Sequence, residues 1–319
     1  MRPGAAAGHQ GYFHEAVCYA SDEELLGVAV PFLLGGVQAG EPTVVSLGER
    51  TAGLLRDELG DVEGIVFQAG GAVYARPAVA IRSYQHLLAG YAARGAGQIR
   101  VIGEIPAFGL GTTWDWWARY EAVISRAYGA YPLWSMCAYD TRTTPGHVLE
   151  DVARTHPRNA EPDGSHRPSP GYAGAVAFLS QEHVVTPDPI ERTAPLVDLF
   201  EPAPGEARRA LAGALHAHLD ADGFDDLLVA VSETVTNAIE HGTPPVRLRC
   251  WAAPGRLVVK VTDAGPGPGD PFAGLMPAAK APDGGMGLWL AHQLCDHVTF
   301  GRTPEGEFVV RLTAGTPLS

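Results

Sequence analysis

Short apolar runs alternate with amphipathic stretches over the first half of the chain. Apolar runs that suit buried strands occur at 16–20, 43–47, 64–68, 99–103 and 133–139. Stretches with the spacing of amphipathic helices lie between them, at 49–59, 77–94, 114–128 and 145–155. Apolar strands that are joined by helices predict an α/β domain whose parallel sheet is covered on both faces.

The composition changes after this region. Residues 157–192 are rich in Pro, Gly, Ser, Asn and Asp. Such residues form turns and supply little apolar surface for packing. We therefore expect a linker at 157–192, between a first domain at 11–156 and a second domain at 193–313.

The second domain follows a different order of elements. Periodicity predicts helices at 204–219, 224–240 and 286–295, and strands at 246–251, 257–263, 297–302 and 307–312. The turns Ala253-Pro-Gly255 and Glu305-Gly306 join these strands into two hairpins. Helices followed by hairpins are typical of an α+β layer, with one mixed or antiparallel sheet and helices on one face.

Composition and charge limit the classes of partner that the chain is expected to bind. Its 319 residues are 46% hydrophobic and carry a formal net charge of −13. Nucleic acid and anionic membranes repel such a charge. No apolar run has the length of a membrane span, and the first ten residues lack a secretory h-region. The sequence therefore predicts a cytoplasmic protein that binds neither nucleic acid nor membrane.

Several side chains are expected to serve packing alone. The tryptophans of Trp114-Asp-Trp-Trp117, with Tyr120, are interpreted as a packing face or a dimer surface rather than a ligand cage. The cysteines lack any C-x-x-C spacing and lie in apolar patterns, so buried free thiols are expected. These cysteines are Cys18, Cys137, Cys250 and Cys295.

One predicted helix carries a polar edge beside its apolar face. Glu233, Asn237 and His241 recur every four residues and therefore lie along one side of the helix. The amide oxygen of Asn237 suits Mg²⁺, which prefers oxygen ligands. Glu233 is placed to orient or deprotonate a hydroxyl that attacks a phosphate. A solvated helix face is the alternative. The apolar face is predicted to consist of Leu227, Val231, Val235 and Ile239.

Glycine-rich segments downstream favour a nucleotide site over that alternative. Asp263 shares strand parity with the apolar residues before it, so its carboxylate is expected to be buried and to need a donor such as an adenine amino group. Free amides at the start of the last helix attract phosphate. A lid is expected at 268–283, from which Lys280 reaches phosphate or is simply solvated. The glycines and the leucine of these segments are Gly265, Gly267, Gly284, Gly285, Gly287 and Leu288.

These motifs resemble those of a known family. Residues 193–313 are similar to the GHKL, or Bergerat-fold, ATP-binding domain, and within it to RsbW-like anti-sigma-factor serine kinases. Residues 233–242 match the pattern E-x-x-x-N-A-x-x-H-G, and the glycine segments match the two boxes that follow it. The resemblance implies that Asn237 holds Mg²⁺, Asp263 reads adenine, and Glu233 is the base toward a serine. The ATP-binding set it implies is Asn237, His241, Asp263, Gly265, Gly267, Gly284, Gly285, Gly287 and Leu288.

The first domain is similar to MEDS-type sensory domains, which resemble RecA/KaiC-like ATPase sheets. The matching segments are Phe13-His-Glu-Ala16, Ile102-Gly-Glu-Ile-Pro106 and Cys137-Ala-Tyr-Asp140. No phosphate loop of the form G-x-x-x-x-G-K-[ST] occurs here, so nucleotide hydrolysis by this half is not expected. Charged residues near strand ends are interpreted as a sensory ligand site or as simple caps. They are His14, Glu104 and Asp140.

The resemblance implies a regulatory protein of sigma-factor partner switching. Its expected partners are a sigma factor and a STAS-type anti-anti-sigma protein, with ATP and Mg²⁺ as cofactors, and it implies a homodimer. One alternative is a non-catalytic module that sequesters a sigma factor while ATP sets its conformation. Another is an orphan sensor histidine kinase. No long dimerisation helix with a phosphoacceptor histidine is evident, and His216 and His218 are interpreted as surface or packing residues.

Overall fold

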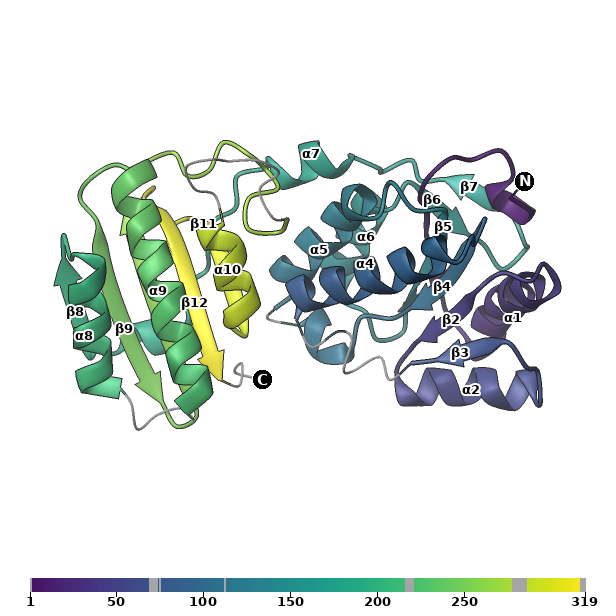
Figure 1. The fold of residues 1–319 in the computed structure, drawn as a ribbon, viewed down its shortest axis with the longest axis horizontal. Helices are drawn as coiled ribbons and strands as arrows, with labels where there is room; N and C mark the ends of the chain where they lie inside the picture. Colours follow the sequence, from purple (N-terminus) through teal and green to yellow (C-terminus); the bar gives the residue numbers. More distant parts are fainter. Residues whose placement is uncertain are drawn as a thin grey trace. The chain divides into compact units, whose positions relative to one another are not determined.

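Two compact units make up the chain, Met1–Leu179 and Ser180–Ser319, and both are drawn in Figure 1. The structure is a computed structural model that describes residues 2–68, 74, 76–111, 113–215, 221–276 and 286–315. Unit 1 and unit 2 below refer to these two units.

Unit 1 is built on a seven-stranded sheet in the order β3-β2-β4-β5-β1-β6-β7. Neighbouring strands from β3 to β6 run parallel, as predicted, and β7 is antiparallel to β6. The strands are β1 (Phe13–Tyr19), β2 (Thr43–Ser46), β3 (Ile65–Phe67), β4 (Ile99–Gly103), β5 (Leu133–Asp140), β6 (Arg158–Ala160) and β7 (His166–Pro168).

Helices cover both faces of this sheet (Figure 1). The first helix begins at Ser21, whose side chain accepts a hydrogen bond from the amide of Glu24, as a capping residue does. It packs on the second helix and on β1. The later helices of unit 1 pack on one another. The helices are α1 (Asp22–Gln38), α2 (Glu49–Leu59), α4 (Pro77–Ala93), α5 (Trp114–Ala127), α6 (Gly146–Thr155) and α7 (Ala175–Leu179).

The segment expected as a linker is instead packed structure. β6 pairs with β1, β7 pairs with β6, and α7 packs on α5. Nearer unit 2, Glu191 pairs with Lys260, and Asp188 pairs with Arg256. The expectation considered only apolar surface, whereas strand pairing and buried ion pairs hold this polar segment in place.

Unit 2 has a five-stranded antiparallel sheet in the order β11-β12-β10-β9-β8. The strand β8 at its edge was not predicted, because two exposed apolar residues, Leu196 just before the strand and Phe200 at its end, conceal the alternation that marks a strand. The strands are β8 (Val197–Phe200), β9 (Arg247–Ala253), β10 (Arg256–Asp263), β11 (His297–Arg302) and β12 (Phe308–Gly315).

Three helices lie on one face of this sheet, as the sequence predicted (Figure 1). They are α8 (Pro204–Leu215), α9 (Ala221–His241) and α10 (Gly287–Leu294). α9 buries Leu227, Val231 and Val235, but Ile239 is 50% exposed and Ala238 takes the expected core position. A helix of 3.6 residues per turn drifts with steps of four, so a step of three returns to the core. None of the described helices combines the length and apolar character that a membrane crossing requires.

The side chains expected to serve packing behave largely as predicted. All four cysteines are free thiols, and Cys250 and Cys295 are buried. Cys18 is exposed, contrary to expectation, although its neighbours Val17 and Tyr19 in β1 are buried. The tryptophans at 114, 116 and 117 are buried inside unit 1, which confirms the packing interpretation.

Removal of the buried Arg256 guanidinium should destabilise unit 2. Arg256 donates to both carboxylate oxygens of Asp188, and the two side chains are 8% and 9% exposed. Arg256→Ala leaves a buried carboxylate unpaired, so we expect the free energy of unfolding to fall by about 3 kcal/mol. Arg247→Ala breaks a pair with Asp198 that is 47% and 37% exposed, and should cost less than about 1 kcal/mol. Calorimetric unfolding of the two variants measures the difference, and equal losses would contradict the argument.

Acid should weaken the same pair. Burial disfavours the charged form of Asp188, but hydrogen bonds from Arg256 and from the Ile190 amide lower its pKa below the ordinary value. A carboxylate with a lowered folded-state pKa contributes stability above its unfolded pKa of about 4 and loses it as the pH falls through the folded value.

Candidate functional site

A cavity of about 370 Å³ lies between α9, α10 and the sheet of unit 2. It brings together five residues singled out from the sequence: Asn237 and His241 from α9, Asp263 from the end of β10, Gly267 from the loop that follows, and Leu288 from α10. The remaining walls are mostly apolar. They are formed by Thr234, Ala238, Gly242, Val261, Pro268, Gly269, Ala273, Phe308 and Val310.

The polar edge of α9 borders this cavity. Asn237 is half-buried and lines it, and His241 lines it from the exposed end of the helix. Glu233 is half-buried one turn before Asn237 and lies outside the lining set. Its carboxylate approaches the first residue of α10, since a Cβ atom placed on Gly287 would lie 3.1 Å from Glu233 Oε2 and 2.7 Å from Asn237 Nδ2. The two polar side chains and the N-terminus of α10 therefore meet at one place.

Asp263 is the buried carboxylate that strand parity predicted. Its side chain is 4% exposed, and its Oδ1 accepts hydrogen bonds from the amides of Thr243 at 3.1 Å and Gly265 at 2.7 Å. Within the described residues, the recorded hydrogen bonds of this carboxylate all involve Oδ1. The second oxygen, Oδ2, is therefore available to a donor in the cavity.

Two glycines permit the close approach of backbone to this carboxylate. A Cβ atom on Gly242 would lie 2.7 Å from Asp263 Oδ1, and one on Gly265 would lie 2.6 Å from it. Gly267 has a different role, because its φ of 78° is in the left-handed region that favours glycine, and a Cβ atom there would strike the Phe308 ring. These glycines let the loop after β10 pass directly over the cavity.

Arg302 was not recognised from the sequence, although it supports the same loop. It lies at the end of β11 and donates to the backbone oxygens of Gly265 at 2.8 Å and Pro266 at 3.0 Å. Arg302 follows this loop by 35 residues or more in the sequence, so no local pattern links the two. Its place at the end of an edge strand is the feature that could have suggested a contact with the loop.

Some expected residues of this site lie outside the described part of the chain. They are Gly284, Gly285 and Lys280, together with residues 277–283 of the expected lid at 268–283. His216 and His218, which were interpreted as surface or packing residues, also lie outside the described residues.

The three residues expected to form a sensory site in unit 1 do not all lie at one edge of the sheet. His14 lies near the start of β1 and pairs in register with Ser135, whereas Asp140 pairs with Tyr19 at the far end of that strand. Asp140 forms ion pairs with Arg142 and Arg50, which lower its pKa, mainly through hydrogen bonds from Arg142. Glu104 accepts a hydrogen bond from the amide of Gly48 at 3.1 Å. Glu104 and Asp140 lie at the carboxyl ends of β4 and β5, whereas His14, which was expected either to join that crevice or to cap the first strand, lies near the opposite end of β1.

Family models match both units. Residues 13–157 match the MEDS model, the methanogen/methylotroph, DcmR sensory domain. Residues 202–313 match the histidine kinase-like ATPase domain. The chain thus carries a MEDS domain followed by a histidine kinase-like ATPase domain, as the motifs predicted.

Similarity to solved structures is remote. The RsbU and RsbW domains of Rv1364c from Mycobacterium tuberculosis align with 37% of this chain and 32% of their own, at 20% identity and a TM-score of 0.26. The histidine kinase domain of the E. coli osmosensor EnvZ aligns with 40% of this chain and 92% of its own, at 19% identity and a TM-score of 0.24. The chain therefore spans about a third of the first of these. Scores this low do not bear on function, and no curated protein matches the chain.

Proposed function

We propose that unit 2 binds ATP with Mg²⁺ in the cavity beside α9 and phosphorylates a serine of a STAS-type anti-anti-sigma protein, under control of a sensory unit 1. In this proposal the same surface binds a sigma factor when the partner is phosphorylated. The observation that carries nucleotide binding is the convergence of Asn237, Asp263 and the N-terminus of α10 on one cavity. The match to a histidine kinase-like ATPase domain supports it.

The residues of the cavity fit the parts of a nucleotide. Asp263 Oδ2 is positioned to accept a hydrogen bond from an adenine amino group, and the apolar walls suit a ring system. Asn237 offers an amide oxygen to a hard cation. The free amides at the start of α10 favour phosphate oxygens. Bound ATP supplies the phosphoryl group, and Mg²⁺ supplies positive charge that offsets its oxygens.

Glu233 is proposed as the base. Its carboxylate lies at the N-terminus of α10, next to Asn237, which is where the terminal phosphate would be held. From there it would accept the proton of a serine hydroxyl as that oxygen forms a bond to the terminal phosphorus and the bond between this phosphorus and the ADP leaving group breaks. For unit 1 we propose a RecA/KaiC-like sheet that has no phosphate loop and acts as a sensor.

Nucleotide affinity should depend on the two polar residues of the cavity. Asn237→Ala removes the proposed metal ligand, and Asp263→Asn removes the charged acceptor. Loss of a hydrogen bond to a charged group is worth about 1.5–3 kcal/mol, so each change should weaken ATP–Mg²⁺ binding about 10- to 100-fold. Isothermal titration calorimetry measures this effect. Glu240→Ala, on the exposed end of the same helix, is the control and should bind as the wild type does. Unchanged affinity in both test variants would overturn the site assignment.

Substitution of Glu233 should slow phosphoryl transfer and leave ATP binding intact. With γ-labelled ATP and a STAS-type partner, Glu233→Ala should lower the transfer rate about 100-fold or more while ATP still binds, because a general base contributes about that factor. Glu240→Ala is again the matched control.

The outcome distinguishes three functions. Acid-stable phosphate on the partner, lost in Glu233→Ala, supports the serine kinase. Wild-type protein that binds ATP and transfers no phosphate favours a nucleotide-gated binding module. Acid-labile phosphate indicates a histidine kinase.

A further inference from the structure

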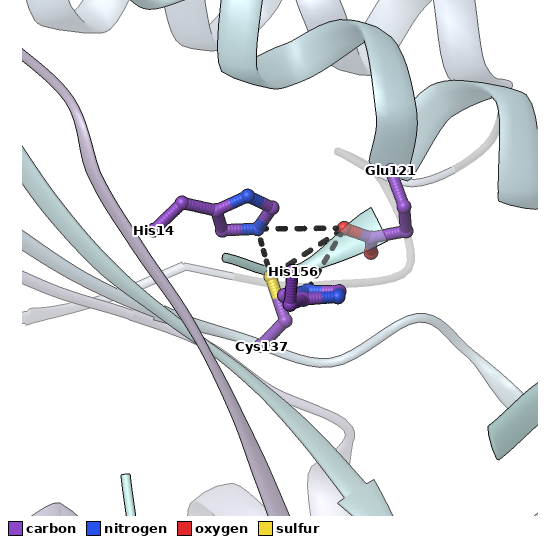
Figure 2. Close-up of side chains that lie close together, drawn as sticks. All are labelled: His14, Glu121, Cys137 and His156. Atoms are coloured by element: carbon purple, nitrogen blue, oxygen red, sulfur yellow. Dashed lines mark hydrogen bonds and ion pairs between the residues drawn. The ribbon is translucent and has the colours of Figure 1, made fainter. Parts of the chain in front are cut away.

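Four side chains with metal-ligating atoms meet in the interior of unit 1, away from the cavity of unit 2. His14 comes from β1, Cys137 from β5, Glu121 from α5, and His156 directly follows α6. One donor atom from each lies within 4.8 Å of the others. Figure 2 shows the two imidazole rings and the thiol directed toward the carboxylate of Glu121.

The carboxylate of Glu121 in this cluster is buried, so its negative charge needs a positive partner. Glu121 and His156 are 0% exposed, and His14 is 2% exposed. Burial, reinforced by His156, lowers the pKa of His14 well below its ordinary value. Among the described residues, no Lys or Arg forms an ion pair with Glu121. A buried carboxylate in that situation calls for a cation.

The distances between donor atoms match those around a tetrahedral metal ion. Bonds of about 2.0 Å to nitrogen or oxygen and about 2.3 Å to sulfur place tetrahedral ligand atoms about 3.3–3.6 Å apart. Cys137 Sγ lies 3.5 Å from His14 Nε2 and 3.7 Å from Glu121 Oε2. Glu121 Oε2 lies 3.3 Å from His156 Nε2 and 3.7 Å from His14 Nε2.

Outer contacts orient each imidazole and the carboxylate. His156 Nδ1 lies 2.9 Å from the backbone oxygen of Val152, and His14 Nδ1 lies 3.3 Å from Ser125 Oγ. A proton held on Nδ1 leaves the lone pair of Nε2 pointing into the cluster, as in histidine-ligated metal sites. Among the described residues, His156 Nε2 has no hydrogen-bond partner, although it lies 3.3 Å from Glu121 Oε2. The hydroxyl of Tyr139 donates to Glu121 Oε1 at 2.9 Å, which leaves Oε2 for the cluster.

We propose that His14, Glu121, Cys137 and His156 bind one Zn²⁺ ion in tetrahedral coordination. Imidazole and thiolate ligands select a borderline or soft metal over Mg²⁺ or Ca²⁺. Binding replaces the S–H bond of Cys137 with an S–Zn bond and releases that proton to solvent. Two positive charges then meet one carboxylate and one thiolate, so the buried site has no net charge. Four protein ligands fill the coordination sphere and tie β1, β5, α5 and α6 together, which is the arrangement of a structural zinc site.

Metal content and spectroscopy of the full chain test this site. The wild type purified without chelator should contain about one zinc ion per chain by elemental analysis. Replacement by Co²⁺ should give the strong d–d bands of tetrahedral cobalt and a thiolate-to-cobalt charge-transfer band. Removal of zinc should lower the melting temperature, and added Zn²⁺ should restore it. Wild-type protein with neither bound zinc nor a thiolate–cobalt band would overturn the proposal.

Matched variants locate the metal. Cys137→Ser should abolish the charge-transfer band, whereas Cys18→Ser, at the exposed cysteine of β1, should retain it. His156→Gln should lose zinc, and His147→Gln, at an exposed position of α6, should not. A band that survives in Cys137→Ser would overturn the assignment.

If loss of a metal ligand prevents folding, a variant that keeps all four ligands still tests the zinc site. Tyr139→Phe retains all four ligands and removes only the hydrogen bond to Glu121 Oε1. Loss of such an outer contact typically weakens metal binding about 10- to 100-fold. We expect that loss in competition with a zinc chelator, with the charge-transfer band retained at saturating Co²⁺. Unchanged zinc affinity in this variant would contradict the proposed role of Glu121.

Discussion

A carboxylate that leaves water must receive hydrogen-bond donors or a positive charge, and this requirement shapes both units. In unit 2, Asp263 accepts from two backbone amides, so the loop after α9 and the loop after β10 are tied to one oxygen atom. Asp188 meets the same requirement with the guanidinium of Arg256. In unit 1, Glu121 is surrounded by two imidazoles, a thiol and a hydroxyl. The three carboxylates differ in the partner available to them: backbone amides for Asp263, a cationic side chain for Asp188 and, in our proposal, a metal ion for Glu121.

Much of unit 2 could be predicted because its signals are local. Strand parity placed Asp263 on the buried face, and the spacing of Glu233, Asn237 and His241 placed them along one side of α9. The hydrogen bonds from Arg302 to the loop after β10 could not be predicted, because they depend on which edge strand ends beside that loop. The packed segment at 157–192 was also missed, since its anchors are ion pairs to residues far along the chain rather than an apolar pattern.

Unit 1 shows the same limit more strongly. As far as α6, the alternation of strands and helices was predicted because these elements carry their own periodicity, whereas β6, β7 and α7 were missed. The cluster around Glu121 has no such signal: its members are separated by 107, 16 and 19 residues along the chain (from 14 to 121, to 137, to 156), and a parallel sheet with crossovers brings them together. His14 was singled out and placed before the first strand, but its proximity to Glu121, Cys137 and His156 was not predicted, because the sequence does not state which distant segments meet that end of β1. Residue types therefore predict the chemistry of a site only when the topology that brings the residues together is also known.

The geometry at the start of α10 connects the proposed nucleotide site of unit 2 with the proposed catalytic base. Gly287 leaves room for no side chain between α10 and the pair formed by Glu233 and Asn237. A displacement of α10 therefore moves the phosphate-binding amides relative to the proposed metal ligand and the proposed base at the same time. A nucleotide that orders this junction would change both the catalytic geometry and the surface offered to a partner protein. The kinase and the nucleotide-gated binding module are in this sense two uses of one junction, and they differ only in whether Glu233 receives a proton from the bound partner.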